Sequence, residues 1–178
     1  MSAAVPGDSD LDRRFALPAT ADDRTLLDTF LDFQRDALVR KCADLSDEQL
    51  RSRPVPSSSL SLLGLVRHLA TVERWYFQGV VADEPWPGDL FDLTDDFDAP
   101  FHDVAHATGR ESFALWREQV AASRRIAAAR PLDAIGRTPG TGAERSLRWV
   151  LTHMIDEYAR HLGQADILRE AVDGLAGE

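Results

Sequence analysis

Cysteine, lysine and long apolar runs are what this sequence has least of. Cys42 is the only cysteine among 178 residues, which excludes an internal disulfide framework and a cysteine-rich zinc module. Of the 20 basic residues, 19 are arginine, a bias typical of GC-rich genomes. No run approaches the ~18 consecutive apolar residues of a membrane span, and the N-terminal stretch "MSAAVPGDSDLDRR" lacks the basic and apolar regions of a secretory signal. We therefore expect a cytoplasmic protein with no membrane partner.

Positive charge is also scarce, because 30 acidic residues give a formal net charge of −10. A nucleic-acid-binding domain normally carries a basic stripe, so no nucleic-acid partner is expected. With 44% hydrophobic and 28% charged residues, the composition is that of a soluble globular protein, and the length suffices for one domain with a sizeable core. We expect residues 1–20 to form a flexible N-terminal arm and residues 21–178 to form a single domain.

Apolar residues recur at helical spacing in four long segments. The predicted helices cover residues 22–43, residues 58–82, residues 109–130, and a fourth segment that ends near residue 172. Ser58 or Ser59 is expected to cap the second helix, and the spacing of Thr141 and Glu144 predicts a capping box for the fourth. Strand signals are few, and a short β-ribbon near residues 134–139 is considered but not predicted. The fold class is therefore all-α, and a four-helix bundle is the natural way to bury four apolar stripes.

The second and third helices are joined by a long acidic connection, "DEPWPGDLFDLTDDFDAPFHDVAHAT". Connections of this length in compact domains usually carry function or span the fold. His102 and His106 stand four residues apart in it, but no third ligand accompanies them, so we predict no metal there. Asp95, Asp96 and Asp98 lack the glycine and closing glutamate of an EF-hand. A solvated acidic loop is predicted instead.

The fourth helix places polar groups in the middle of its apolar face. With about 100° between successive residues, Glu157 and His161 project on the same side as Met154 and Leu168. An ionised carboxylate inside a bundle is costly unless it is paired or bound to a cation. Two explanations stay open at this point, an ordinary Glu–His pair or a shared metal ion. His153 lies nearer the border of this face, where it either lines a pocket or only packs.

The second helix contains one further inward histidine, His68 in "SLLGLVRHLATVERWYF". A lone histidine on an apolar stripe is usually a satisfied core residue. If the second and fourth helices are neighbours, however, His68, Glu157 and His161 supply two imidazoles and one carboxylate to one site. This set suits Zn²⁺ in a catalytic site with an open position, and it also suits Fe²⁺ or Ni²⁺. Zn²⁺ is our first choice.

These two stretches resemble the DinB-like superfamily of metal-dependent four-helix bundles, in particular its mycothiol- and bacillithiol-dependent transferase branch, with the maleylpyruvate isomerase-like N-terminal domain. The resemblance covers residues from about 20 to 172. It rests on the inward His68 and on the motif Glu/His-x-x-x-His-x-Gly-Gln, present as Glu157, His161, Gly163 and Gln164. It implies an up-down-down-up bundle with the acidic connection as a crossover, a divalent metal held by His68, Glu157 and His161, and a homodimer.

The same resemblance implies an S-transferase or isomerase that takes a low-molecular-weight thiol, mycothiol for a GC-rich genome, and an electrophilic substrate. Metal binding deprotonates a coordinating thiol at neutral pH, so the protein needs no nucleophile of its own. Cys42 agrees with this, because we interpret it as a small buried hydrophobe. The alternatives are a hydrolase that uses metal-bound water and a non-catalytic stress protein that binds a metal or small ligand. Trp75, Tyr76 and Trp86 either line the pocket mouth or belong to the core.

Overall fold

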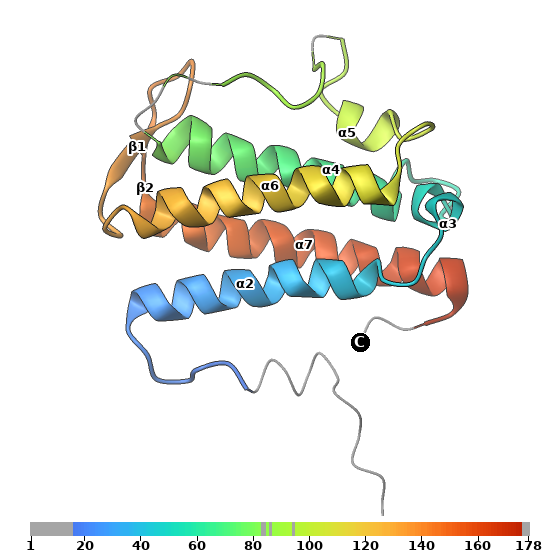
Figure 1. The fold of residues 1–178 in the computed structure, drawn as a ribbon, viewed down its shortest axis with the longest axis horizontal. Coiled ribbons are helices and arrows are strands. Elements are labelled where there is room, and N and C mark those ends of the chain that lie inside the picture. The colour runs from blue at the N-terminus through green and yellow to red at the C-terminus, as the bar shows by residue number, and fades with distance from the viewer. Residues whose placement is uncertain (1–15, 83–84, 86, 94, 176–178) are drawn as a thin grey trace, which may run out of the picture.

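The computed structural model describes residues 16–82, 85, 87–93 and 95–175. Its long helices are α2 (Asp23–Lys41), α4 (Leu62–Glu73), which continues as the π-helix η1 (Arg74–Val81), α6 (Gly109–Ala128) and α7 (Leu147–Asp173). The helices α2 and α7 run in one direction, and α4 and α6 run in the opposite direction (Figure 1). This up-down-down-up order confirms the all-α bundle. None of the helices described is long and apolar enough to cross a membrane.

Side chains cap each long helix and define where it begins. Asp22, Ser61, Thr108 and Ser146 accept hydrogen bonds from the backbone N–H three residues on. The predicted caps at Ser58 or Ser59 and the predicted Thr141–Glu144 capping box were therefore wrong. For the second helix, residues 58–60 are still non-helical, and the helix begins only after Ser61.

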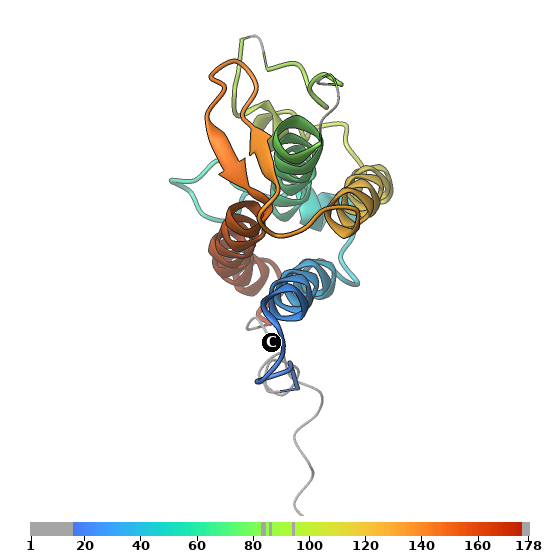
Figure 2. The same cartoon turned by 90° about the vertical axis from the view of Figure 1, so that its left-hand side faces the viewer.

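The fourth helix begins late because a β-hairpin precedes it. Strand β1 (Ile135–Arg137) pairs antiparallel with β2 (Glu144–Ser146), so the backbone stays extended until Ser146. The hairpin packs against η1 (Figure 2). Gly136 permits this approach, because any side chain there would overlap the Val80 carbonyl. The ribbon that we did not predict therefore exists, and it displaces the predicted capping box.

The connection between η1 and α6 is a crossover that returns along α4 (Figure 1). Its short helix α5 (Ala99–His102) rests on α4. A Cβ atom at Gly64 would lie 3.1 Å from the Phe101 Cα, so glycine allows the two backbones to approach this closely. The Arg67 Nε donates to the Pro100 carbonyl at 3.3 Å. The crossover is thereby held over the middle of α4, next to His68.

A buried polar network joins all four long helices. The Arg35 guanidinium of α2 donates to both carboxylate oxygens of Glu73 of α4, each at 2.8 Å. The Tyr158 hydroxyl of α7 donates to Glu73 Oε1 at 2.8 Å, and the Trp116 indole of α6 donates to the Tyr158 oxygen at 2.8 Å. Glu73 is 0% exposed, and its hydrogen bonds offset the cost of burying its charge.

A second short helix, α3 (Asp47–Arg51), follows α2.

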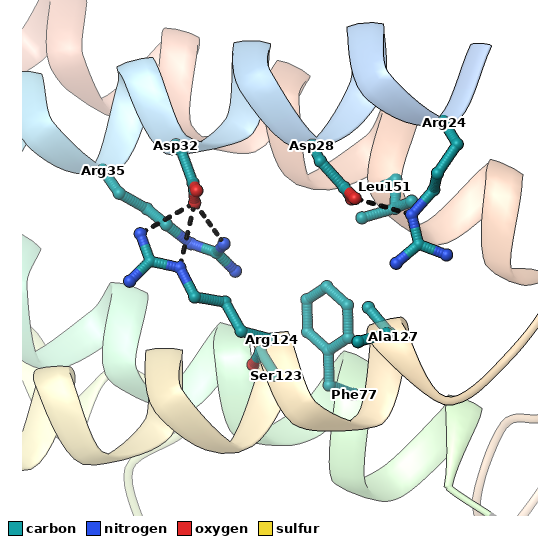
Figure 3. A pocket seen from close by; sticks show the side chains of 10 residues that line it. Arg24, Asp28, Asp32, Arg35, Phe77, Ser123, Arg124, Ala127 and Leu151 are labelled. Atoms are coloured by element: carbon teal, nitrogen blue, oxygen red, sulfur yellow. Dashed lines mark hydrogen bonds and ion pairs between the residues drawn. The ribbon is translucent and has the colours of Figure 1, made fainter. Parts of the chain in front are cut away.

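A small cavity of about 220 Å³ lies between α2 and α6 (Figure 3). Its charged side chains are paired with one another. Asp32 Oδ1 accepts from Arg35 at 3.0 Å and from Arg124 at 2.9 Å, and Asp28 accepts from Arg24 at 2.6 Å. None of the predicted metal ligands lines this cavity, and the Asp32–Arg124 pair links α2 to α6 across it.

The boundary between an arm at residues 1–20 and a single domain at residues 21–178 stays a prediction. Residues 1–15 lie outside the described residues, as does Trp86.

Candidate metal centre

The structure brings the three predicted ligands together. His68 projects from α4, and Glu157 and His161 project one turn apart from α7. The Nε2 atoms of His68 and His161 each lie 3.1 Å from Glu157 Oε1. One ligand atom from each residue lies within 4.8 Å of the other two. The rotation angles along α7 predicted this face correctly, and the packing of α4 against α7 supplies the third group.

The spacing of these atoms fits a bound cation. Two ligand atoms that bind zinc at about 2.1 Å and at a tetrahedral angle are about 3.4 Å apart; each histidine Nε2 lies 3.1 Å from Glu157 Oε1, and the three ligand atoms lie within 4.8 Å of one another. Two imidazoles with one carboxylate form a donor set of catalytic zinc sites, which keep one position open. Among the described residues, no other set of three or more His, Cys, Asp or Glu side chains is arranged to hold a metal ion.

Neighbouring side chains orient the two imidazole rings. His161 Nδ1 lies 2.7 Å from Gln164 Oε1; an amide oxygen only accepts, so Nδ1 donates to it, and Nε2 is the ring nitrogen directed at the site. The His68 ring stacks on Phe101 at 4.6 Å and meets the His161 ring edge-on at 4.6 Å. Gln164 was present in the sequence motif. Phe101 was missed, because only the seating of α5 on α4 brings it to His68.

Glu157 is ionised at neutral pH in this arrangement. The hydrogen bonds from His161 and His68 hold the pKa of Glu157 well below its ordinary value, against partial burial, which raises it. A carboxylate with two imidazole partners provides the negative charge that a divalent cation requires. The side chains of His68, Glu157 and His161 are 23%, 18% and 10% exposed, respectively. The site is therefore accessible from one side.

A cleft of about 570 Å³ opens beside the ligands. His68 and Glu157 form part of its wall, and α4, η1, the crossover and α7 supply the rest. The other lining residues are Thr71, Val72, Trp75, Tyr76, Asp89, Leu93, Phe97, Pro100 and His153. The crossover residues of this wall were not predicted, because an acidic connection with many prolines carries no periodic signal.

His153 lies on the wall of this cleft. Its ring stacks on Trp149 at 5.0 Å and tilts against Tyr76 at 4.6 Å. The structure therefore favours the pocket position over simple packing. Trp75 and Tyr76 line the cleft as well, in agreement with one of the two interpretations of these aromatic residues.

The remaining candidates lie elsewhere. His102 forms an exposed pair with Asp96 at 2.7 Å, and the described residues place no third ligand beside it or beside His106. Cys42 is buried, as predicted, and burial raises the pKa of its thiol to about 12. Its sulfur is therefore a poor nucleophile at neutral pH.

The fold is a DinB-like four-helix bundle. It has the helix order and the long crossover of such bundles, with histidine and glutamate side chains directed into the interior. A family model described as mycothiol-S-transferase matches residues 26–174, and the chain belongs to this family. The chain is also similar to a solved structure described as a conserved protein from Enterococcus faecalis, with 17% identity, coverage of 88% of this chain and 100% of that chain, and a TM-score of 0.59. That likeness concerns the fold alone. No curated protein matches the chain.

Proposed function

We propose that this protein is a divalent-metal-dependent S-transferase that joins mycothiol to an electrophilic substrate. One observation carries the proposal: in a chain of the mycothiol S-transferase family, His68, Glu157 and His161 converge on one point at the wall of a cleft. The metal, its identity as Zn²⁺ with Ni²⁺ or Fe²⁺ as alternatives, a homodimer and a cytoplasmic location belong to the proposal.

The chain's own side chains have defined parts in this proposal. His68 and His161 would offer Nε2 atoms and Glu157 an oxygen to the cation, with Gln164 keeping His161 in the required tautomer. A divalent cation in such a site supplies charge that lowers the pKa of a thiol to below neutral. Cys42 is too buried to compete as a nucleophile, which leaves the sulfur of the small thiol to attack.

The reaction balances without any further reagent. The thiol sulfur forms a bond to the electrophilic carbon, the bond from that carbon to its leaving group breaks with its electron pair, and the thiol proton leaves to solvent. An isomerase would instead add the thiol to a carbon of a double bond, allow rotation about the single bond that results, and then eliminate the thiol. The cleft beside His68 and Glu157 provides the space for the substrate.

Chelation combined with removal of the thiol tests the proposal. The chain is purified without a histidine tag, its metal content is measured, and conjugation of monobromobimane is followed with mycothiol, bacillithiol, glutathione or no thiol. We expect the mycothiol-dependent rate to fall at least tenfold after chelation and to return with Zn²⁺. A thiol-independent rate of ester hydrolysis would instead favour a hydrolase. Less than a tenth of an equivalent of metal, with no effect of added Zn²⁺ or Ni²⁺, would favour a non-catalytic protein.

A further inference from the structure

Part of the lining of the cleft is apolar. Val72 and Trp75 contribute from α4 and η1, and Leu93, Phe97 and Pro100 contribute from the crossover. Phe97 is 84% exposed, although it lies at the rim of a concave surface. A large exposed aromatic side chain that continues an apolar wall marks a surface for an apolar ligand.

The charge that the cleft presents is negative. Among the described residues that line it, none is arginine or lysine, whereas Asp89 and Glu157 are acidic. A bound divalent cation would be balanced by Glu157 and by the negative charge of the thiol. Asp89 then adds a negative charge to the described part of the lining.

Arg67 and Arg74, which are next in sequence to the cleft residues His68 and Trp75, are both engaged with the crossover. Arg67 lies over the Phe91 ring at 4.2 Å and donates to the Pro100 carbonyl. Arg74 donates to the Gly88 carbonyl at 2.7 Å and to the Pro87 carbonyl at 3.1 Å. Both guanidinium groups therefore hold the crossover in place.

Proteins bind carboxylates with arginine or lysine, often in bidentate pairs, and an unpaired charge is costly to move from water into a cleft. From the apolar wall, the acidic lining and the engaged arginines, we infer that this cleft selects uncharged, largely aromatic or apolar electrophiles and disfavours carboxylated ones. This inference rests on the proposed function, because it names the substrate class of the same site.

Binding of a matched, unreactive pair of compounds tests the inference directly. The full-length protein, as purified and saturated with mycothiol, is titrated by calorimetry with 3,5-dinitrobenzamide and with 3,5-dinitrobenzoate, which differ in charge and lack a leaving group. Saturating thiol would occupy an open position on a bound metal, so that the benzoate would not bind there as a ligand. We expect the amide to bind at least fivefold more tightly. Equal binding, or tighter binding of the benzoate, would overturn the inference.

A charge reversal locates the preference. Asp89→Arg changes an exposed residue of the lining, and we expect it to reduce the preference for the amide at least threefold. Asp133→Arg makes the same change in net charge at an exposed residue that does not line the cleft, and we expect it to leave the preference unchanged. An equal effect of both variants would assign the selectivity to the overall charge and refute the role of the cleft.

A kinetic comparison separates this inference from the proposed function. Rates with 4-chloro-3,5-dinitrobenzamide and 4-chloro-3,5-dinitrobenzoate are each divided by the uncatalysed rate with mycothiol, and the amide should give the larger acceleration. Catalysis of both compounds with a preference for the benzoate would refute the substrate class and leave the S-transferase in place. No catalysis with either compound, while the amide binds more tightly, would refute the S-transferase and leave the selectivity of the cleft in place.

Discussion

Removing one proposed ligand by the substitution His161→Ala should remove most of the stabilisation of this protein by zinc. At a zinc concentration one hundred times the dissociation constant, binding stabilises the folded state by about 2.7 kcal/mol. For a domain of this size that amount raises the melting temperature by about 5–11 °C. Of the three proposed ligands, the variant keeps only His68 and Glu157. If its affinity is a hundredfold lower, the same zinc concentration contributes about 0.4 kcal/mol, or about 1–2 °C.

Differential scanning fluorimetry of metal-stripped protein, with and without zinc, measures both shifts, and elemental analysis measures the metal retained. His106→Ala is the matched control, because it removes an exposed histidine that belongs to no cluster of three ligands among the described residues. It should behave as the parent does. Circular dichroism should show unchanged helix content in both variants. If His161→Ala keeps the parent's zinc shift and metal content, the proposed centre is wrong.

Four further predictions follow from the structure. Gln164→Ala removes the acceptor that orients His161 and should weaken zinc binding about 10–100-fold, measured by competition with a chelator; an unchanged affinity would contradict this role. Hydrogen bonds lower the pKa of Glu157 in the folded state. At a pH above 4.5, the ordinary pKa of this carboxyl, the ionised side chain therefore stabilises the metal-free protein. This contribution is lost as the pH falls below 4.5. In urea titrations without metal, Glu157→Gln should therefore destabilise at pH 7, and the difference should narrow below pH ~4.5; a difference that widens there would refute the assignment. Cys42 should not react with Ellman's reagent at pH ~8 until the protein unfolds, because burial raises its pKa; rapid labelling of the native protein would show that it is accessible. Tyr158→Phe deprives Glu73 of a donor and Trp116 of an acceptor and should lower the free energy of unfolding by about 1–3 kcal/mol; a loss below that range in urea would mean that water replaces the hydroxyl.

The helices and the ligand-bearing faces could be predicted because they depend on local periodicity. A helix repeats every 3.6 residues, so the inward position of Glu157 and His161 follows from the sequence of α7 alone. The position of His68 needed one further assumption, that α4 and α7 are neighbours, and the structure shows this contact. The up-down-down-up order came from the resemblance to a family and was confirmed by the structure.

The features that could not be predicted depend on contacts between distant segments. The start of α7 was misplaced because the pairing of β2 with β1 overrides a local capping signal. Phe101 stacks on His68 only because the crossover rests on α4 at Gly64. Similarly, Arg35 and Glu73 are 38 residues apart, and helical spacing does not reveal that each buries its charge against the other.

The buried network also bears on the proposed metal centre. Each of the four long helices supplies one member, Arg35, Glu73, Trp116 or Tyr158, so that none of them can rotate about its own axis without breaking a hydrogen bond in the interior. In α7, Tyr158 lies between the proposed ligands Glu157 and His161, directly after Glu157. The arrangement of His68, Glu157 and His161 is consequently set by the fold itself, and a cation that bound there would not require the helices to rearrange.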